Sequence, residues 1–147
     1  MTMTSGMYSS ETPEWGTPQD LFDKLNDEFH FDLDIAASDS NHKCERYYTK
    51  ETDGLAHRDE WSGRVWCNPP YGRVIGDWVK ACAEYSKKFN LAVMLLPART
   101  DTKWFHDYIY SNPDAEIRFL KGRLHFNDSK NSAPFPSMVV VFRKKLL

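Results

Sequence analysis

The sequence is poor in the features that mark disulfide-rich, metal-binding and membrane-spanning proteins. Three cysteines occur among 147 residues, widely spaced and without a Cys-x-x-Cys pair, and the five histidines lack metal-ligand spacing; neither a disulfide framework nor a metal site is expected. No apolar run approaches the roughly 20 residues that span a membrane. The polar residues 1–10 lack the apolar core of a signal peptide and are expected to form a flexible tail. A cytoplasmic protein without a membrane partner fits best.

Strong net charge is also lacking, but the charge is unevenly distributed. The formal net charge is -2, so no global basic field indicates a nucleic acid. Residues 1–73 carry 7 Lys/Arg and 14 Asp/Glu, whereas residues 74–147 carry 12 and 7. This asymmetry is compatible with different partners on different faces, and equally with ordinary variation among solvated helices.

Apolar periodicity in the remaining 137 residues, 11–147, predicts one α/β domain. A helix is expected to begin with Thr17 as its N-cap and Pro18 at its first position. Strands alternating with helices favour a sheet that is parallel first and antiparallel at its end, with ligands beyond the carboxyl ends of its strands. Expected helices are 18–29, 75–89 and 104–109; expected strands are 29–35, 45–49, 65–67, 91–96, 117–120, 124–126 and 138–142.

The tetrapeptide Asn68-Pro69-Pro70-Tyr71 is the strongest functional signal, and it directly follows a short apolar strand. An exocyclic amine on a purine is a poor nucleophile because its lone pair is delocalised into the ring. Two acceptors, the Asn68 side-chain oxygen and the Pro69 carbonyl held by its rigid turn, would favour the tetrahedral nitrogen that attacks a sulfonium methyl. Tyr71 would stack on the base, which must be flipped out of a duplex.

A methyl donor needs polar groups for its ribose hydroxyls and a backbone that its methionine part can approach closely. Three segments are candidates for this site. Residues 34–38 (Asp-Ile-Ala-Ala-Ser) follow a strand and are small, residues 15–18 precede a helix, and Asp53 lies on a loop. Helix N-termini favour carboxylates. Taken alone, residues 34–38 are better explained as a strand-end turn and residues 15–18 as a plain helix cap, and a solvated turn explains Asp53 equally well.

Eight short segments, taken in chain order, form a pattern that one known family shares. They are residues 15–18 (Trp-Gly-Thr-Pro), 31–38 (Phe-Asp-Leu-Asp-Ile-Ala-Ala-Ser), 53–55 (Asp-Gly-Leu), 61 (Trp), 68–71 (Asn-Pro-Pro-Tyr), 96–102 (Leu-Pro-Ala-Arg-Thr-Asp-Thr), 121–124 (Lys-Gly-Arg-Leu) and 134–138 (Pro-Phe-Pro-Ser-Met). Over residues 11–143 the pattern resembles the compact Dam-type DNA N6-adenine methyltransferases of bacteriophages and prophages.

This resemblance implies a Rossmann-like methyltransferase sheet with helices on both faces, S-adenosylmethionine as cofactor, and adenine in double-stranded DNA of a bacterial host cell as substrate. Family members are linked to GATC methylation. The resemblance makes residues 68–71 the catalytic turn. The residues it places beside the donor, together with those suggested by the segments above, are Trp15, Thr17, Pro18, Asp34, Ala36, Ala37, Asp53 and Asn68.

The basic half supplies the candidate DNA contacts, which are Arg99, Thr100, Lys121 and Arg123. Any one of them is equally explained as a surface charge. A chain of 147 residues leaves little room for a separate target-recognition domain, so recognition is expected from loops, from the tail or from a second subunit in a homodimer. Asn-Pro-Pro-Tyr alone also serves methyltransferases of cytosine N4 or protein glutamine, and a non-catalytic donor-binding or DNA-binding module is a third reading.

Overall fold

The computed structural model describes residues 15–145, so the predicted tail at residues 1–10 lies outside the described residues. Helices and strands alternate along most of the chain, as the apolar periodicity predicts. The elements are α1 (Gln19–Phe29), β1 (Leu33–Asp34), β2 (Arg46–Tyr47), β3 (Arg64–Cys67), α2 (Ile75–Ser86), β4 (Leu91–Pro97), α3 (Lys103–Phe105) continued by a π-helical turn (His106–Tyr110), β5 (Ala115–Phe119) and β6 (Ser137–Arg143).

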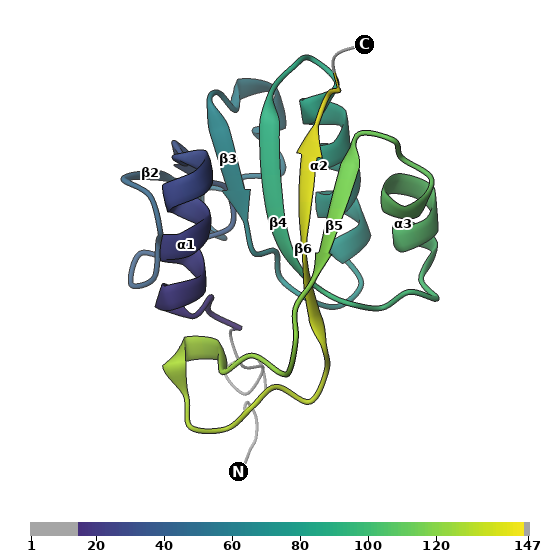
Figure 1. The fold of residues 1–147 in the computed structure, drawn as a ribbon. Helices are drawn as coiled ribbons and strands as arrows, with labels where there is room; N and C mark the ends of the chain where they lie inside the picture. The colour runs from purple at the N-terminus through teal and green to yellow at the C-terminus, as the bar shows by residue number, and fades with distance from the viewer. Residues whose placement is uncertain (1–14, 146–147) are drawn as a thin grey trace.

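The six strands form one sheet in the order β2-β1-β3-β4-β6-β5 (Figure 1). Strands β2, β1, β3 and β4 are mutually parallel. Strand β6 runs antiparallel to both of its neighbours, β4 and β5. The prediction of a mostly parallel sheet with an antiparallel end is therefore confirmed. Because β5 is parallel to β4, the carboxyl ends of β1, β3, β4 and β5 all reach the same edge.

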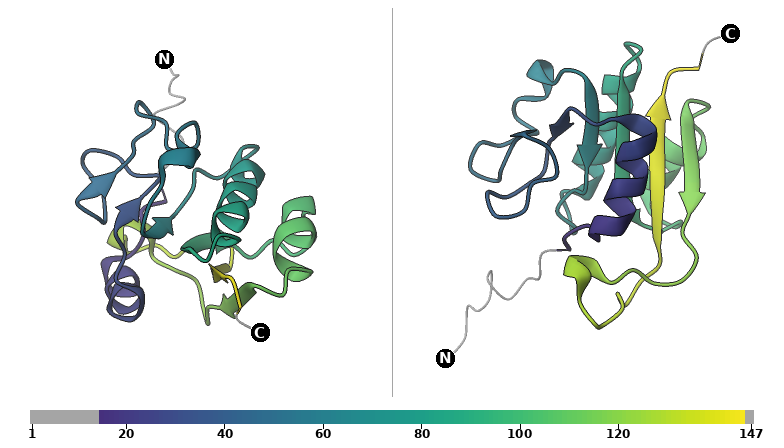
Figure 2. Two further views of the ribbon diagram at one scale, coloured as in Figure 1. Left: turned by 90° about the horizontal axis from the view of Figure 1, so that it is seen from above. Right: turned by 60° about the vertical axis from the view of Figure 1, so that its left-hand side comes forward.

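Helices cover both faces of the sheet (Figures 1 and 2): α1 lies on one face, and α2 and α3 lie on the other. Helix α1 buries Phe22, Leu25 and Phe29 against a core that includes Trp66 and Val93. Helix α2 buries its apolar stripe against the opposite core, which includes alternate residues of β4. All seven residues of β4 are buried, because a strand between two helical layers has no solvated face.

The start of the chain differs from the sequence prediction in two respects. Pro18 is the N-cap residue of α1 and no side chain caps the helix, so Thr17 is not the cap. Strand β1 has two residues, not the seven of the alternating stretch 29–35, because Phe29 completes α1 and His30 ends it in a left-handed conformation. Helix burial outweighs the local alternation there.

Two further predictions are wrong at loop positions. Residues 124–126 were expected to be a strand, but Phe126 begins a short 3-10 turn (Phe126–Asp128) and is buried among other aromatic rings. Phe89 was expected on the buried face of the second helix. It instead follows the end of α2 with a φ of 63° and is 67% exposed, so a left-handed residue breaks the helical periodicity.

Candidate functional site

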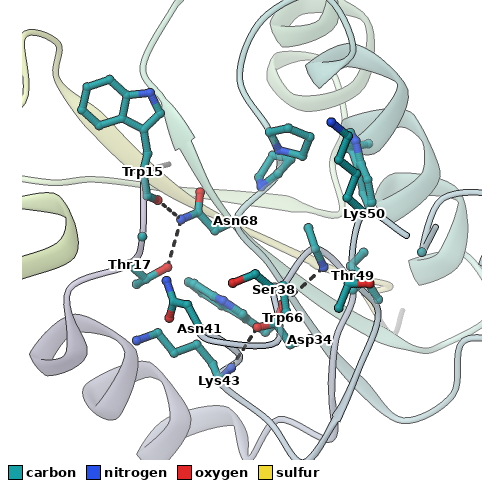
Figure 3. Close-up of a pocket in the computed structure, with 18 of the residues that line it drawn as sticks. Trp15, Thr17, Asp34, Ser38, Asn41, Lys43, Thr49, Lys50, Trp66 and Asn68 are labelled. Carbon is teal, nitrogen blue, oxygen red and sulfur yellow. Dashed lines mark hydrogen bonds between the residues drawn. The ribbon is translucent and has the colours of Figure 1, made fainter. Parts of the chain in front are cut away.

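A cavity of about 740 Å³ opens at the sheet edge where β1 and β3 end. This volume lies within the range of small-molecule sites. The cavity is walled by the segment before α1, the residues after β1, the loop after β2 and the turn after β3 (Figure 3). The predicted site residues that line it are Trp15, Thr17, Asp34, Ala36, Ala37, Asp53, Asn68, Pro69, Pro70 and Tyr71.

Asn68 is held in one orientation by the segment before α1. Its Nδ2 donates to the Trp15 carbonyl oxygen and, at 3.1 Å, to Thr17 Oγ1, as the dashed lines in Figure 3 show. Its Oδ1 is buried and accepts no hydrogen bond from the residues that the structure describes. Leaving a buried acceptor unmatched costs about 1–3 kcal/mol. The site therefore presents an oriented acceptor that a ligand N–H can satisfy.

Tyr71 belongs to an aromatic cluster beside Asn68, formed with Trp15, Phe126 and Phe135. The Tyr71 ring lies nearly parallel to Trp15, with ring centres 6.5 Å apart and planes at 20°, and meets Phe126 and Phe135 edge-on. Its hydroxyl is buried and has no hydrogen-bond partner within residues 15–145. Burial raises the pKa of Tyr71, so the phenol stays neutral and apolar faces dominate this part of the cavity.

Asp34 ties the loop after β1 to the floor of the cavity. Its Oδ1 accepts from the backbone N–H of Ala36 at 3.2 Å, and its Oδ2 accepts from that of Lys43 at 3.0 Å. The residue is 3% exposed. Burial raises its pKa to about 6, although these two backbone hydrogen bonds oppose the shift. Asp34 therefore shapes residues 36–43 directly, in addition to bordering the cavity.

Gly54 allows the loop after β2 to approach the end of β1 closely. A Cβ at this position would lie 2.2 Å from the Ile35 carbonyl oxygen, so no other residue fits without a backbone shift. The Gly54 carbonyl accepts from Trp61 Nε1 at 2.9 Å, and the preceding Asp53 has a φ of 56°. This packing brings Asp53 and Gly54 into the cavity wall beside the end of β1.

Comparison with known proteins assigns this chain to a family. A family model of DNA N-6-adenine-methyltransferase (Dam) matches residues 4–146. This chain belongs to the Dam family. A DNA N-6-adenine-methyltransferase of Escherichia phage T1 is 40% identical over 95 residues, which are 62% of this chain and 38% of that protein. One of Haemophilus phage HP1 (strain HP1c1) is 29% identical over 153 positions, covering 99% of this chain and 87% of that protein.

In this Dam-family chain the predicted DNA contacts lie outside the cavity, at the same edge of the sheet. Arg99 and Thr100 are exposed after β4, and Lys121 and Arg123 are exposed after β5. The two groups adjoin through residues 136 and 137, since the Ala98 backbone N–H donates to the Pro136 carbonyl at 2.9 Å and the Leu120 backbone N–H donates to the Ser137 carbonyl at 3.1 Å. Arg123 Nη1 also donates to the Ala133 carbonyl at 3.4 Å, so its role is partly structural. Pro18, a predicted donor contact, does not line the cavity.

Sequence reasoning missed the polar residues Asn41, Lys43 and Lys50 of the cavity wall, and also Phe126 and Phe135, which do not line the cavity but pack on Trp15 and Tyr71. Both phenylalanines lie in the segment between β5 and β6 and pack on Trp15 at ring-centre distances of 5.3 Å. A signal was present, since two phenylalanines in an otherwise polar connection, one of them between two prolines, need a buried partner. Among residues 15–145 no acidic, histidine or cysteine cluster is arranged to hold a metal, and no helix there is long and apolar enough to cross a membrane.

Proposed function

We propose that this chain transfers a methyl group from S-adenosylmethionine to the exocyclic N6 of adenine in double-stranded DNA, inside a bacterial host cell. The observation that carries the proposal is the buried Asn68 Oδ1, an acceptor without a partner in the described chain, on a turn whose sequence suits amine methylation. Membership of the Dam family supports adenine over the cytosine and glutamine amines that the same turn can serve. The sheet order and the antiparallel β6 fit a Rossmann-like methyltransferase fold.

Asn68 Oδ1 and the Pro69 carbonyl oxygen would act on the amine by accepting hydrogen bonds from its two N–H groups. With both hydrogens held away from the ring plane, the nitrogen lone pair is released from conjugation and points toward the donor. S-adenosylmethionine supplies the electrophilic methyl group on a sulfonium sulfur. No strong base is required at Asn68, because the amine loses its proton after it has gained the methyl group. Since the acceptor is oriented before the substrate arrives, little reorganisation is needed in the transition state.

The donor fits the part of the cavity formed by the ends of β1 and β2. Ala36 and Ala37 leave space beside the backbone, and Gly54 lets the loop that carries Asp53 pack closely on the end of β1. Asp53 offers a carboxylate for the ribose hydroxyls, and Thr17 and Trp15 close the side next to Asn68. Pro18, which does not line the cavity, would act by starting α1 and thereby fixing Thr17.

Lowering the pH through about 6 is expected to weaken donor binding while the fold becomes more stable. The pKa of Asp34 is raised by burial from 3.8 to about 6. Between these values the folded chain binds a proton that the unfolded chain lacks, so the free energy of unfolding rises by roughly 1 kcal/mol for each unit that the pH falls. The protonated carboxyl is a poorer acceptor for Ala36 and Lys43, which loosens residues 36–43.

Calorimetric donor titrations and urea unfolding between pH 5 and 8 would measure both effects in parallel. The Asp34→Asn variant is the control, because its amide has no proton to gain in this range and both curves should lose their inflection near pH 6. Donor affinity that stays level in the wild-type chain across this range would show that Asp34 does not organise the donor site.

The DNA would lie over the segment between β5 and β6, because two loops beside the cavity differ in charge. Residues 120–136 carry three Lys/Arg and one Asp, whereas residues 36–60 carry four Lys/Arg and six Asp/Glu. A polyanion is attracted to the first loop and repelled by the second. Arg99 and Thr100, which adjoin residues 120–136, extend the same surface toward α3. Because the cavity admits only a base removed from its stack, the target adenine would be flipped.

Replacing Lys121 and Arg123 by alanine is expected to weaken DNA binding more at low salt than at high salt. Each lost phosphate contact should reduce the slope of log affinity against log salt by about 0.9. Fluorescence anisotropy with labelled duplex at 50 and 200 mM salt measures the affinity for DNA and its salt dependence. Lys88→Ala is the matched control, since Lys88 is exposed beyond the end of α2, at the opposite edge of the sheet. Unchanged affinity at both salts would remove these two side chains from the interface.

A labelling experiment tests the proposed reaction as a whole. The protein is incubated with radiolabelled S-adenosylmethionine and unmethylated duplex DNA, and the DNA is digested to nucleosides. Label in N6-methyladenine supports the proposal. Label in N4-methylcytosine or in protein would replace it with another amine substrate, and donor binding without any transfer would indicate a non-catalytic module. Duplexes with and without GATC, compared in the same assay, test that target sequence.

A further inference from the structure

The short segment that precedes α1 lies between the Asn68 turn and the connection from β5 to β6 (Figure 1). On one side, Asn68 Nδ2 donates to the Trp15 carbonyl oxygen and to Thr17 Oγ1. On the other side, the Asn127 backbone N–H donates to the Gly16 carbonyl oxygen at 2.7 Å. Three consecutive residues therefore connect the Asn68 amide to a distant part of the chain.

The backbone of Asn127 has a conformation that few residue types adopt. Its φ is 57° and its ψ is 22°, and Asp128 after it has a φ of 55°. Both values fall in the left-handed region, which asparagine and aspartate tolerate better than other residues with a side chain. Such positions persist where the surrounding contacts hold them. A residue at 127 that avoids this region would move the N–H away from the Gly16 carbonyl.

Gly16 allows the two segments to approach each other closely. It is buried, and a Cβ on it would lie 2.2 Å from Asn127 Oδ1 and 2.6 Å from Asn41 Nδ2. Two side-chain amides therefore occupy the space beside Gly16. Phe126, the residue before Asn127, packs on the Trp15 ring with ring centres 5.3 Å apart. Adjacent residues of one loop thus contact adjacent residues of the segment before α1.

We propose that Asn127 is a positioning residue for the methyl transfer and acts on Asn68 through Gly16. The inference rests on the proposed function and adds to it a residue outside the cavity. The Asn127 backbone fixes the Gly16 carbonyl, and Gly16 joins the two residues that accept from the Asn68 amide. A displacement of about 1 Å can lower the rate of an active site by about 100-fold. Because Asn127 belongs to residues 120–136, the same contact links the proposed DNA surface to the amide.

The test compares Asn127→Val with Asn127→Gly. A β-branched side chain disfavours the left-handed region, whereas glycine adopts it readily. Valine should therefore displace the backbone N–H, and glycine should keep it in place while the side chain is lost. Phe89→Val is the matched control. Phe89 is also left-handed, with a φ of 63°, but it is exposed and lies beyond the end of α2.

The first readout is the side-chain amide signal of Asn68 in nuclear magnetic resonance spectra of isotope-labelled protein. This signal is identified by its absence from the spectrum of Asn68→Ala. In Asn127→Val it should move toward the position of exposed amides, and its protons should exchange with water about 10-fold faster or more. In Asn127→Gly and Phe89→Val the signal should stay at its wild-type position.

The second readout is the single-turnover rate of N6-methyladenine formation at saturating donor and DNA, below the melting temperature of every variant. The rate should fall by about 10-fold or more in Asn127→Val and by less than about 2-fold in Asn127→Gly and Phe89→Val. Donor affinity is also expected to fall in Asn127→Val, because residues 15–17 line the cavity. Saturating donor removes the influence of that weaker binding.

Two results would overturn the inference. In the first, Asn127→Val leaves both the Asn68 amide signal and the rate unchanged. In the second, Asn127→Gly is impaired as much as Asn127→Val, which would assign the effect to the side chain. If Asn127→Val does not fold, Asn127→Ala replaces it, since it differs from Asn127→Gly by one methyl group. Failure of the proposed function is distinguishable, because wild-type protein would then place no label in adenine, whereas the Asn68 signal would still respond to Asn127→Val.

Discussion

Replacing Asn68 by alanine is expected to reduce methyl transfer by about 100-fold or more, the effect typical of removing one preorganised hydrogen-bond partner from an active site. The acceptor Oδ1 is lost, and no other described side chain offers a buried acceptor held as Asn68 is held by Trp15 and Thr17. The measurement is the single-turnover rate of N6-methyladenine formation at saturating donor and DNA. Weaker donor binding is also expected, because Asn68 lines the same cavity. Saturating donor removes the influence of that weaker binding, so the measured rate reports the chemical step.

Asn90→Ala is the matched control for this variant. Asn90 precedes β4, and its Nδ2 donates to the Tyr85 carbonyl at 3.4 Å, so its removal deletes the same amide at the other edge of the sheet. The control should transfer methyl groups at the wild-type rate. If Asn68→Ala keeps more than about a tenth of that rate, the amine is not activated by this side chain and the proposed mechanism is wrong.

Replacing Gly54 by alanine is expected to destabilise the fold by about 1–3 kcal/mol and to weaken donor binding by about 10-fold or more. The added methyl group would lie 2.2 Å from the Ile35 carbonyl oxygen and 3.0 Å from Tyr48 Cβ. The backbone at the end of β1 must move, since a carbonyl cannot rotate away as a side chain can. Ile35 and Gly54 both line the cavity, so the shift reaches the donor. Thermal unfolding and donor titration measure the two effects.

Gly76→Ala is the matched control, and it is not expected to destabilise the fold. Gly76 is the second residue of α2, and a Cβ there would be 3.5 Å from Trp104 Cβ, which is an ordinary contact. Alanine is favoured over glycine in a helix by up to about 1 kcal/mol. This variant should therefore melt at the wild-type temperature or above it. Equal melting temperatures and donor affinities for Gly54→Ala and Gly76→Ala would contradict the close approach of the two loops.

Local patterns were sufficient to predict the elements whose burial is decided by their own sequence. The continuous apolar run predicts β4 correctly, the helical spacing predicts where α2 begins, and the Asn68 turn follows its strand as expected. Strand β1 was overestimated because its neighbouring residues alternate like a strand but are needed to finish α1. Tertiary packing determines that boundary, and a single sequence does not show it.

The turn at residues 68–71 could be predicted from the sequence, but most of the residues that surround it could not. The aromatic cluster joins Trp15, Tyr71, Phe126 and Phe135 from three distant parts of the chain, and no periodicity relates those positions. Thr17 fitted the pattern of a helix cap, yet its hydroxyl accepts from Asn68, 51 residues away in sequence. A hydroxyl can serve either purpose, so only the fold distinguishes them.

The central position of β6 has a consequence for how the protein is made. Among residues 15–145 this strand comes last in the chain, yet it lies between β4 and β5 and pairs with both. Until residues 137–143 have been synthesised, β4 and β5 have no partner on their facing edges, and apolar β4 exposes an open edge that favours association with other chains. Folding must wait for contacts between distant parts of the chain, which is expected to make it slow. Nascent chains halted before Ser137 should therefore depend on chaperones and be readily degraded.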